Sequence, residues 1–357
     1  MQEDLLSSIN IQKVAKSRIK DLDFENIQFG KVFTDHMFIM DYKDGKWHTP
    51  VIKAFEPLIM HPATSVLHYG QSIFEGMKAY RNERGEVFLF RPEKNVKRLN
   101  VSAERMCMPH VPEDVMFNGL SELVKLDQEW IPVNRGSSLY IRPLLFATDE
   151  YIGVKPSQTY RLMIFLAPVN QYYKGAVKVK IEEHFSRAVK GGTGYAKAAG
   201  NYAASLYPAK QAQKEGFDQL IWTDAIEHKY IEESGTMNII FRTGNKIISP
   251  SVGDSILSGV TRDSILRLAE SWGYEVEERK VEVQEIVDLL RKGELNEVFG
   301  AGTAATIARI KAIGFRDEVF ELSNVDDWEF ANKANEELIA LRRGEKEDTM
   351  GWTHRLV

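Results

Sequence analysis

Short hairpins interspersed with helices constrain the fold of this 357-residue sequence more than any other feature. In the first half, segments rich in apolar and aromatic residues flank the turns Asp44-Gly45 and Arg84-Gly85, and such turns favour antiparallel hairpins. Residues 92–106 and 112–130 have helical periodicity. Antiparallel strands mixed with helices differ from a repeating strand–helix–strand chain and predict an α+β fold.

A polar, aromatic segment, PVNQYYKG, separates the two halves of the sequence. It predicts an N-terminal α+β domain over residues 1–168, an interdomain linker over 169–177 and a C-terminal domain over 178–357. The length is about twice that of a typical domain, which agrees with two cores. The remaining predicted strands cover 138–146, 160–168, 178–185, 217–224, 229–235 and 237–250, and 296–310 is predicted to be strand and turn. The predicted helices cover 201–216, 261–273, 283–293 and 328–343.

The composition of the sequence indicates which partners, which location and which bonds or metals to expect. The net charge is −5 and the basic residues are dispersed, which indicates neither a nucleic-acid partner nor a membrane partner. No apolar run is long enough to span a bilayer, and the start MQEDLLSSIN is too polar for a signal peptide, so we expect a cytoplasmic protein. The single cysteine, Cys107, excludes an internal disulfide and is expected to pack in the core. His61 and His68 lack the spacing of a metal-binding helix, so no metal is expected.

Lys197 lies in the small-residue run GGTGYAKAAGNYAAS, between Tyr195 and Tyr202. A lysine amine held at a pocket wall can form a Schiff base with a carbonyl compound or with pyridoxal phosphate. The alternative is an ordinary lysine whose apolar stem lies along the edge of a glycine-rich loop while its amine reaches water. The run by itself does not decide between the two.

Three segments are candidates for a phosphate site. In SGVTRDSI, residues 258–260 precede a helix that is expected to begin near Thr261, so its free N–H groups could face an anion or could form an ordinary helix start. The segment GAGTAAT, from Gly300 to Thr306, offers a second turn with exposed amides. Arg98 is either a guanidinium that binds the same phosphate or part of a solvated helix face.

Glu233 lies in YIEESGTMNIIF, directly before a strand that reads as buried. A carboxylate there could keep the pyridine nitrogen of pyridoxal phosphate protonated, which makes the ring an electron sink. The alternative is an exposed turn acid, and this is what we expect of Glu232. Aromatic residues that recur near loops could line an apolar pocket with hydroxyl groups at its edge or could be core: Phe29, Tyr69, Phe74, Tyr140, Tyr172 and Tyr202.

Seven motifs occur in one order: LHYGQSIFEGMKAY, FRPEKNVKRL, SLYIRP, KAAGNYAAS, EESGTMNIIF, LSGVTR and FGAGTAA. With them the chain resembles the branched-chain amino acid aminotransferases nearly end to end, specifically their long, eukaryotic-like branch. The resemblance implies a two-domain D-amino acid aminotransferase-like α+β fold, with a small domain and a larger pseudo-barrel domain that carries the Schiff-base lysine. It also implies a homodimer with pyridoxal 5′-phosphate at the domain interface. Ala305 and Ala308 replace a Cys-x-x-Cys pair of some members, so thiol-based redox control is not expected.

The resemblance also assigns residues to roles. It implies Lys197 as the Schiff-base lysine, Glu233 at the pyridine nitrogen and Tyr202 beside the ring. The phosphate contacts would be Arg98, the amides of Val260 and Thr261, and Thr303. The substrate carboxylate would meet Tyr69 and the backbone at Thr236 and Ala304, and the side-chain pocket would use Phe29, Phe74, Tyr140, Val154 and Tyr172. Arg142 would bind the second carboxylate of glutamate.

The implied activity is reversible amino transfer between L-leucine, L-isoleucine or L-valine and 2-oxoglutarate, which gives the branched 2-oxo acid and L-glutamate. Only small-molecule substrates are expected as partners, besides a second copy of the chain. Two related enzymes of the same fold remain alternatives, a D-amino acid aminotransferase and an aminodeoxychorismate lyase. A third alternative is a cofactor-binding protein without turnover.

Overall fold

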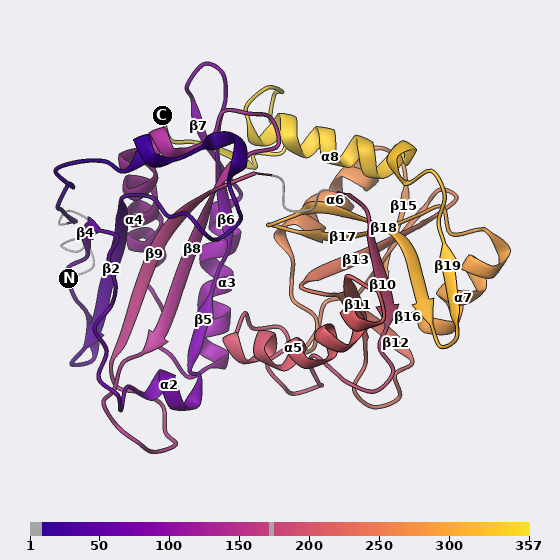
Figure 1. Ribbon diagram of the computed structural model, residues 1–357, viewed down its shortest axis with the longest axis horizontal. Coiled ribbons are helices and arrows are strands. Elements are labelled where there is room, and N and C mark those ends of the chain that lie inside the picture. Colours follow the sequence, from indigo (N-terminus) through magenta and orange to yellow (C-terminus); the bar gives the residue numbers. More distant parts are fainter. Residues whose placement is uncertain (1–8, 171–174) are drawn as a thin grey trace. The chain divides into compact units, whose positions relative to one another are not determined.

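The computed structural model describes residues 9–170 and 175–357, and its chain forms two compact units (Figure 1). The first unit comprises Met1–Tyr172, Ala196–Ala199 and Ile339–Val357, and the second comprises Tyr173–Tyr195 and Gly200–Leu338. Each unit combines a β-sheet with helices, and the predicted two-domain α+β fold is confirmed. The predicted domain limits at 168 and 178 stay a prediction.

The first unit is built on one sheet with the strand order β1-β4-β2-β9-β8-β6-β7-β20, to which β3 and β5 add at β2 and β8. All pairings are antiparallel except that of β1 with β4. The strands are β1 (Asn10–Ile11), β2 (His36–Lys43), β3 (Lys46–Trp47), β4 (Val51–Ala54), β5 (Ser72–Phe74), β6 (Met77–Arg81), β7 (Val87–Phe90), β8 (Ser138–Ala147), β9 (Tyr160–Val169) and β20 (Thr353–Arg355).

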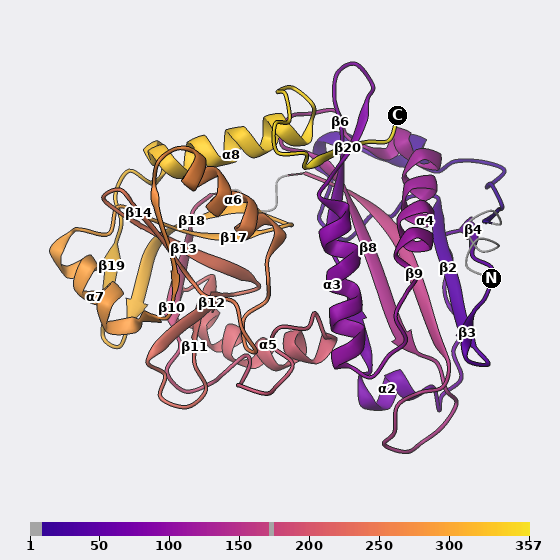
Figure 2. The same ribbon diagram turned by 180° about the vertical axis from the view of Figure 1, so that it is seen from behind.

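Helices α3 (Pro92–Arg105) and α4 (Glu113–Leu126) lie side by side on one face of this sheet, as Figure 2 shows. Their apolar side chains recur every three or four residues and enter the main core with alternate residues of the strands. A Cβ at Gly119 would collide with the ring of Phe38, so the glycine lets α4 approach β2 closely. The opposite face of β8 carries Tyr140 and Arg142, and a short helix, α2 (Ser65–Tyr69), precedes β5.

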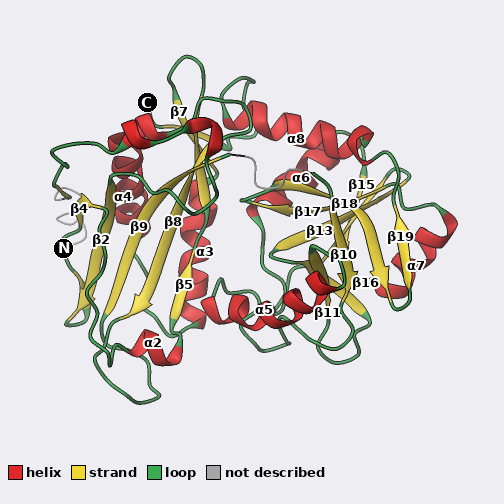
Figure 3. Ribbon diagram, in the orientation of Figure 1, coloured by secondary structure: helices red, strands yellow, loops and turns green. Residues whose placement is uncertain are grey.

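The second unit contains a closed sheet. Strands β12, β13, β17, β18, β10 and β11 pair in a ring, because β12 also pairs with β13. Figure 3 shows the strands of this unit in yellow. Four further strands extend the ring: β14 at β13, β15 at β14, β16 at β12 and β19 at β18. The strands are β10 (Val177–Ile181), β11 (Gln219–Thr223), β12 (Tyr230–Ser234), β13 (Met237–Thr243), β14 (Lys246–Pro250), β15 (Glu275–Arg279), β16 (Val281–Glu282), β17 (Glu297–Gly302), β18 (Thr306–Phe315) and β19 (Glu318–Glu321).

Four helices accompany the strands of the second unit: α5 (Ala199–Lys214), α6 (Val260–Ser271), α7 (Val283–Lys292) and α8 (Glu329–Arg342), the last residues of which group with the first unit. The start of α8 is held by a buried carboxylate on β17. Glu297 accepts hydrogen bonds from the backbone N–H groups of Phe330 (3.0 Å) and Ala331 (2.8 Å) and from Arg242 Nη1 (2.6 Å). This carboxylate satisfies N–H groups that lack partners within the helix.

Short-range predictions agree with the structure. The turns at Asp44-Gly45 and Arg84-Gly85 join β2 to β3 and β6 to β7, and the predicted helices appear with ends that shift by a few residues. The sequence did not indicate the parallel pairs of β10 with β11 and β18, or of β14 with β15. It also did not indicate that β20 pairs with β7.

Candidate functional site

Lys197 lies in the turn before α5, and residues of the first unit hold its backbone. Its N–H donates to Ser102 Oγ on α3 (2.9 Å), and its carbonyl accepts from the N–H of Phe74 at the end of β5 (3.1 Å). The two neighbouring alanines are buried, whereas Lys197 is half-buried. Its Nζ lies 4.9 Å from the centroid of the Phe74 ring. A fixed backbone and an amine over an aromatic face fit a lysine at a pocket wall.

Arg98 is buried on α3, so the interpretation as a solvated helix face is wrong. Its Nε and Nη2 donate to the two carboxylate oxygens of Glu75 at 2.7 Å and 2.8 Å, and Asn95 Nδ2 donates to Glu75 Oε2 at 2.9 Å. Burial raises the pKa of Glu75, but the charge and hydrogen bonds of Arg98, the charge of Lys197 and the hydrogen bond of Asn95 together hold it below its usual value. The Glu75 carboxylate is therefore charged, bonded to Arg98 and within the electrostatic influence of Lys197.

Arg142 lies between two aromatic rings of the same unit. Its guanidinium carbon is 4.6 Å from the centroid of Phe74 and 5.2 Å from that of Tyr140, and its Nη2 donates to the Tyr140 hydroxyl at 3.0 Å. The edge of Phe29 meets the Tyr140 ring at 5.4 Å. A side chain at Gly76 would collide with the Tyr140 hydroxyl, so the glycine leaves room for this group. Arg142 thus contacts two residues predicted for the side-chain pocket, Phe74 and Tyr140, and a third, Phe29, contacts Tyr140.

Tyr69 and Val154, two further predicted substrate residues of the first unit, are exposed. Tyr69 ends α2 and is partly exposed, and Val154, in the loop between β8 and β9, is 91% exposed. Tyr172 lies outside the described residues. The roles of these three residues stay predictions.

In the second unit, Glu233 is buried on β12 and its carboxylate has fixed partners. Oε1 accepts from the N–H of Leu257 at 2.8 Å and from Asn238 Nδ2 at 3.3 Å, and Oε2 lies 3.1 Å from Arg187 Nε. The interpretation of Glu233 as an exposed turn acid is wrong. Three elements, β12, β13 and the loop before α6, hold the carboxylate in one orientation.

The N-terminus of α6 is directly linked to this carboxylate. Asn238 Nδ2 also donates to the Leu257 carbonyl at 2.9 Å, two residues before Gly259, which precedes the first helical residue, Val260. The N-cap position is a glycine and offers no side-chain cap, and a Cβ at Gly259 would collide with Asn238 Oδ1. The first N–H groups of α6 and the Glu233 carboxylate therefore belong to one rigid group of residues within the second unit.

The remaining predicted residues of the second unit lie at element ends. Thr303 and Ala304 form the turn between β17 and β18, and Thr236 is exposed between β12 and β13. Met237 contacts the β17 backbone so closely that a Cβ at Gly300 would collide with its Cε. Tyr202 is half-buried in the first turn of α5. The structure does not test their assignment to cofactor or substrate.

Several residues of these clusters were missed from the sequence. Glu75 lies within a quoted motif, and its place in an apolar strand-like run was the available signal for a buried, paired carboxylate. Asn238 lies in the same motif as Glu233 but was given no role, and Arg187 stands in a segment without distinctive composition, so the fold is what identifies both as partners of Glu233.

Two expectations are wrong. Glu232 is buried on β12 rather than exposed in a turn, and burial raises its pKa even though Ser255 donates a hydrogen bond to it. Cys107 is exposed rather than in the core. Its backbone adopts φ +54° just after the end of α3, and the chain turns there.

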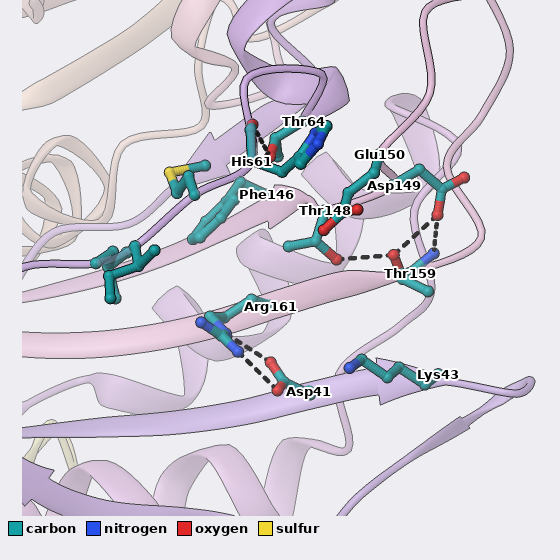
Figure 4. A pocket seen from close by; sticks show the side chains of 13 residues that line it. Asp41, Lys43, His61, Thr64, Phe146, Thr148, Asp149, Glu150, Thr159 and Arg161 are labelled. Atoms are coloured by element: carbon teal, nitrogen blue, oxygen red, sulfur yellow. Dashed lines mark hydrogen bonds and ion pairs between the residues drawn. The ribbon is translucent and has the colours of Figure 1, made fainter.

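A separate pocket of about 490 Å³ lies in the first unit (Figure 4). Its polar groups largely bond to one another: Asp41 accepts from Arg161 at 2.7 Å and 2.9 Å, and Thr159 donates to Asp149 at 2.8 Å. The Asp41 hydrogen bond raises the pKa of Arg161, and in Asp149 hydrogen bonds outweigh burial and lower the pKa. None of the predicted site residues lines this pocket.

The described residues also bear on metal binding and on membrane-spanning helices. Residues 9–170 and 175–357 contain no group of His, Cys, Asp and Glu side chains arranged to hold a metal ion. Over the same ranges, every helix is too short or too polar to cross a bilayer.

Comparison with known proteins adds a family. Residues 72–313 match the model of the class IV amino-transferases. The chain is 47% identical over 335 residues to branched-chain-amino-acid aminotransferase 2 of Bacillus subtilis, covering 93% of this chain and 92% of that protein. It is 41% identical over 351 residues to the branched-chain-amino-acid aminotransferase of Mycolicibacterium smegmatis, covering 96% and 95%. Both relatives are bacterial.

Solved structures agree with the sequence relatives. The branched-chain amino acid aminotransferase of Escherichia coli superposes with a TM-score of 0.74 at 25% identity, over 90% of this chain and 99% of that one. The T.th. branched-chain amino acid aminotransferase complexed with N-(5′-phosphopyridoxyl)-L-glutamate gives a TM-score of 0.72 at 23% identity, over 89% and 98%. The second likeness shows the fold alone.

Proposed function

Because this chain belongs to the class IV aminotransferase family, we propose that it is a pyridoxal-phosphate-dependent branched-chain amino acid aminotransferase. It transfers the amino group reversibly between L-leucine, L-isoleucine or L-valine and 2-oxoglutarate. The products are the branched 2-oxo acid and L-glutamate. The observation that carries the proposal is the similarity to branched-chain aminotransferases over more than nine-tenths of the chain.

The residues of each unit fit pyridoxal 5′-phosphate. In the second unit, a buried carboxylate adjoins a helix N-terminus whose N-cap glycine supplies no side-chain cap, which suits a pyridinium nitrogen and a phosphate. The first unit offers a lysine with a fixed backbone and a buried arginine. The residues that would hold the cofactor are Lys197 at the aldehyde, Glu233 at the ring nitrogen, Tyr202 beside the ring, and Arg98, Thr303 and the amides of Val260 and Thr261 at the phosphate.

When bound, the cofactor supplies an electron sink for the negative charge that develops at the substrate Cα. Lys197 Nζ is the group that takes the proton from Cα in one direction and returns it in the other. Because Ser102 and Phe74 hold the Lys197 backbone, only its side chain needs to move. The hydrogen bonds from Leu257 and Asn238 keep the Glu233 carboxylate in place during turnover.

One side-chain pocket must accept both a branched apolar group and the second carboxylate of glutamate. A fixed buried charge would be left unpaired when leucine binds, which is costly. Arg142 meets both demands, because its guanidinium rests between the Phe74 and Tyr140 rings and donates to a neutral hydroxyl. With leucine bound it stays between the rings, and with glutamate bound it turns to the carboxylate.

Other assignments complete the proposal. Phe29 joins the side-chain pocket, together with Val154 and Tyr172, and the substrate α-carboxylate meets Tyr69 and the backbone at Thr236 and Ala304. The enzyme acts as a cytoplasmic homodimer with domains 1–168 and 178–357 and a linker at 169–177. It belongs to the long, eukaryotic-like branch of the family. Its substrates are small molecules, so we propose no nucleic-acid or membrane partner.

Steady-state kinetics test this function. With 2-oxoglutarate as acceptor, a panel of amino donors is expected to give kcat/KM values for L-leucine, L-isoleucine and L-valine far above those of other amino acids. Activity with D-alanine alone, or with aminodeoxychorismate alone, would replace the proposal by one of the two related enzymes. Undetectable transamination by a cofactor-loaded preparation would favour a binding protein. One methyl group in an apolar pocket is worth only about 1–3 kcal/mol, so the order among the three donors is left to the measurement.

A further inference from the structure

The carboxylate of Glu75 is the least accessible charged group beside the candidate site. Its exposed fraction is 0%, and its two oxygens accept both hydrogen bonds from the Nε and Nη2 edge of Arg98. Asn95 donates a further bond, from one helical turn before Arg98 on α3. The Glu75 carboxylate thus fixes the plane of the Arg98 guanidinium with two parallel bonds.

The backbone of Glu75 is held as firmly as its side chain. Its N–H donates to the Pro143 carbonyl on β8 at 2.9 Å, and the N–H of the preceding Phe74 donates to the Lys197 carbonyl at 3.1 Å. Ser102, which accepts from the Lys197 N–H, lies on α3 four residues after Arg98. Arginine, carboxylate and lysine therefore form one connected framework inside the first unit.

Stability alone does not explain this arrangement. A buried ion pair gains little over apolar side chains of similar size, because removing two charges from water costs about as much as their attraction returns. The pair does restrict the arginine: a long side chain with several rotatable bonds is held in one geometry before any ligand arrives. Two of the five N–H donors of a guanidinium go to Glu75.

We propose that Glu75 is a positioning residue that orients the Arg98 guanidinium for the phosphate group of the cofactor. This inference rests on the proposed function, because that function assigns Arg98 to the cofactor phosphate. Glu75 itself touches neither the cofactor nor the substrate. It acts by reducing the rotational freedom that Arg98 would lose on binding a phosphate.

Neutralisation of the Arg98 charge by Glu75 would change the affinity for phosphate in the opposite direction, so a measurement distinguishes it from positioning. If Glu75 mainly neutralised the charge of Arg98, its removal would leave a stronger cation and phosphate would bind more tightly. If Glu75 mainly positions the guanidinium, its removal loosens phosphate binding. The second outcome follows from the geometry, because both carboxylate oxygens are bonded and the opposite edge of the guanidinium is fixed with them.

The test compares two ligands that differ only in the phosphate. The full chain, freed of cofactor, is titrated with pyridoxal 5′-phosphate and with pyridoxal, and the ratio of the two Kd values isolates the contribution of the phosphate. In Glu75→Gln we expect this ratio to shift about tenfold in favour of pyridoxal, or about 1.4 kcal/mol. Glu75→Asp keeps the charge on a shorter side chain, and its Kd ratio is expected to shift about threefold in the same direction. This second variant provides the test if Glu75→Gln does not fold.

Glu297→Gln is the matched control, because it removes the charge of another buried carboxylate that pairs with an arginine. It is expected to lower the melting temperature and to leave the Kd ratio unchanged. A ratio that stays the same, or shifts in favour of pyridoxal 5′-phosphate, in both Glu75 variants would overturn the inference. If the unaltered chain binds neither ligand, the proposed function itself fails, so the two failures are distinguishable.

Discussion

Two buried carboxylates that pair with arginines, Glu75 with Arg98 in the first unit and Glu297 with Arg242 in the second, have the same chemistry and different surroundings. Glu297 receives one bond from Arg242 and two from backbone N–H groups at the start of α8, so its partners are structural elements. Glu75 receives two bonds from Arg98, and the charge of Lys197 acts on it as well. The same kind of ion pair therefore holds the start of a helix in one place, and in the other we propose that it orients Arg98.

The groups around each pair indicate its role better than the pair itself does. Around Glu297 the neighbouring groups are strands and a helix whose first N–H groups donate to the carboxylate. Around Glu75 the neighbouring groups include a lysine, and the backbone of that lysine is bonded to the residue before Glu75 and to the helix that carries Arg98. Removing single side chains from each region should separate the two roles.

The largest effect is expected for Lys197→Ala, the lysine beside the first pair. Without Nζ, no group takes the proton from the substrate Cα, and kcat is expected to fall about a thousandfold or more. Covalent attachment of the cofactor, measured by mass spectrometry after borohydride reduction, should disappear as well. Lys190→Ala removes an exposed lysine of the same loop and is the control. Activity and attachment that survive in Lys197→Ala would refute the central assignment.

The next effect is on stability, in the second pair. Glu297→Gln leaves the Arg242 cation and the start of α8 with weaker acceptors, so the free energy of unfolding is expected to fall by about 3 kcal/mol. The activity of each folded molecule should stay near that of the unaltered chain. Urea unfolding and kcat measured on the same sample check both statements. A loss of kcat without a loss of stability would contradict the purely structural role of Glu297.

Much of the local structure follows from short stretches of sequence. The Asp44-Gly45 turn needs two residues with positive φ, which asparagine, aspartate and glycine favour, and its hairpin is present with φ values of +52° and +73°. Likewise α4 is visible from the spacing of its apolar residues. The closure of the barrel is not visible, because the pairing of β12 with β13 and of β10 with β18 depends on the whole set of strands rather than on any one of them.

The candidate site divides in the same way. Lys197, Glu233 and Arg98 stand in motifs that carry the family resemblance, so their residue types and order were enough to select them. The partners Asn238 and Arg187 are identified by the fold: Asn238 shares a motif with Glu233, but the motif does not show that the two side chains meet, and nothing in the loop of Arg187 marks it. Cys107 shows the converse: apolar neighbours in the sequence did not bury it, since the chain turns at that residue.

A buried lysine, Lys78 on β6, offers a test through pH. Burial, with the charge of Arg342 as a second cause, lowers the pKa of Lys78 to about 7. Between this value and the usual lysine value near 10.5, the unfolded chain binds more protons than the folded one, so stability rises with pH over that window. Lys78→Met is therefore expected to raise the free energy of unfolding at pH 7, on the order of 2 kcal/mol, with a smaller gain at pH 9.5.

Urea unfolding of the Lys78→Met variant at the two pH values checks this expectation. Lys125→Met on α4 is the control, since Lys125 is half-exposed and bonded to Glu122. It should give the same small change at both pH values. A gain for Lys78→Met that did not shrink at the higher pH would show that packing, and not the proton, accounts for it.

The smallest effect concerns Arg142, a guanidinium that, among the described residues, hydrogen-bonds a tyrosine hydroxyl and forms no ion pair with a carboxylate. This difference from Arg98 and Arg242 supports the proposal that Arg142 serves two substrates. Arg142→Ala is expected to lower kcat/KM for L-glutamate about tenfold more than kcat/KM for L-leucine, since only glutamate has a second carboxylate to bind, and tenfold corresponds to about 1.4 kcal/mol. Arg161→Ala, which removes an arginine paired with Asp41, should lower both values equally. Equal losses in Arg142→Ala would mean that a different group binds the second carboxylate.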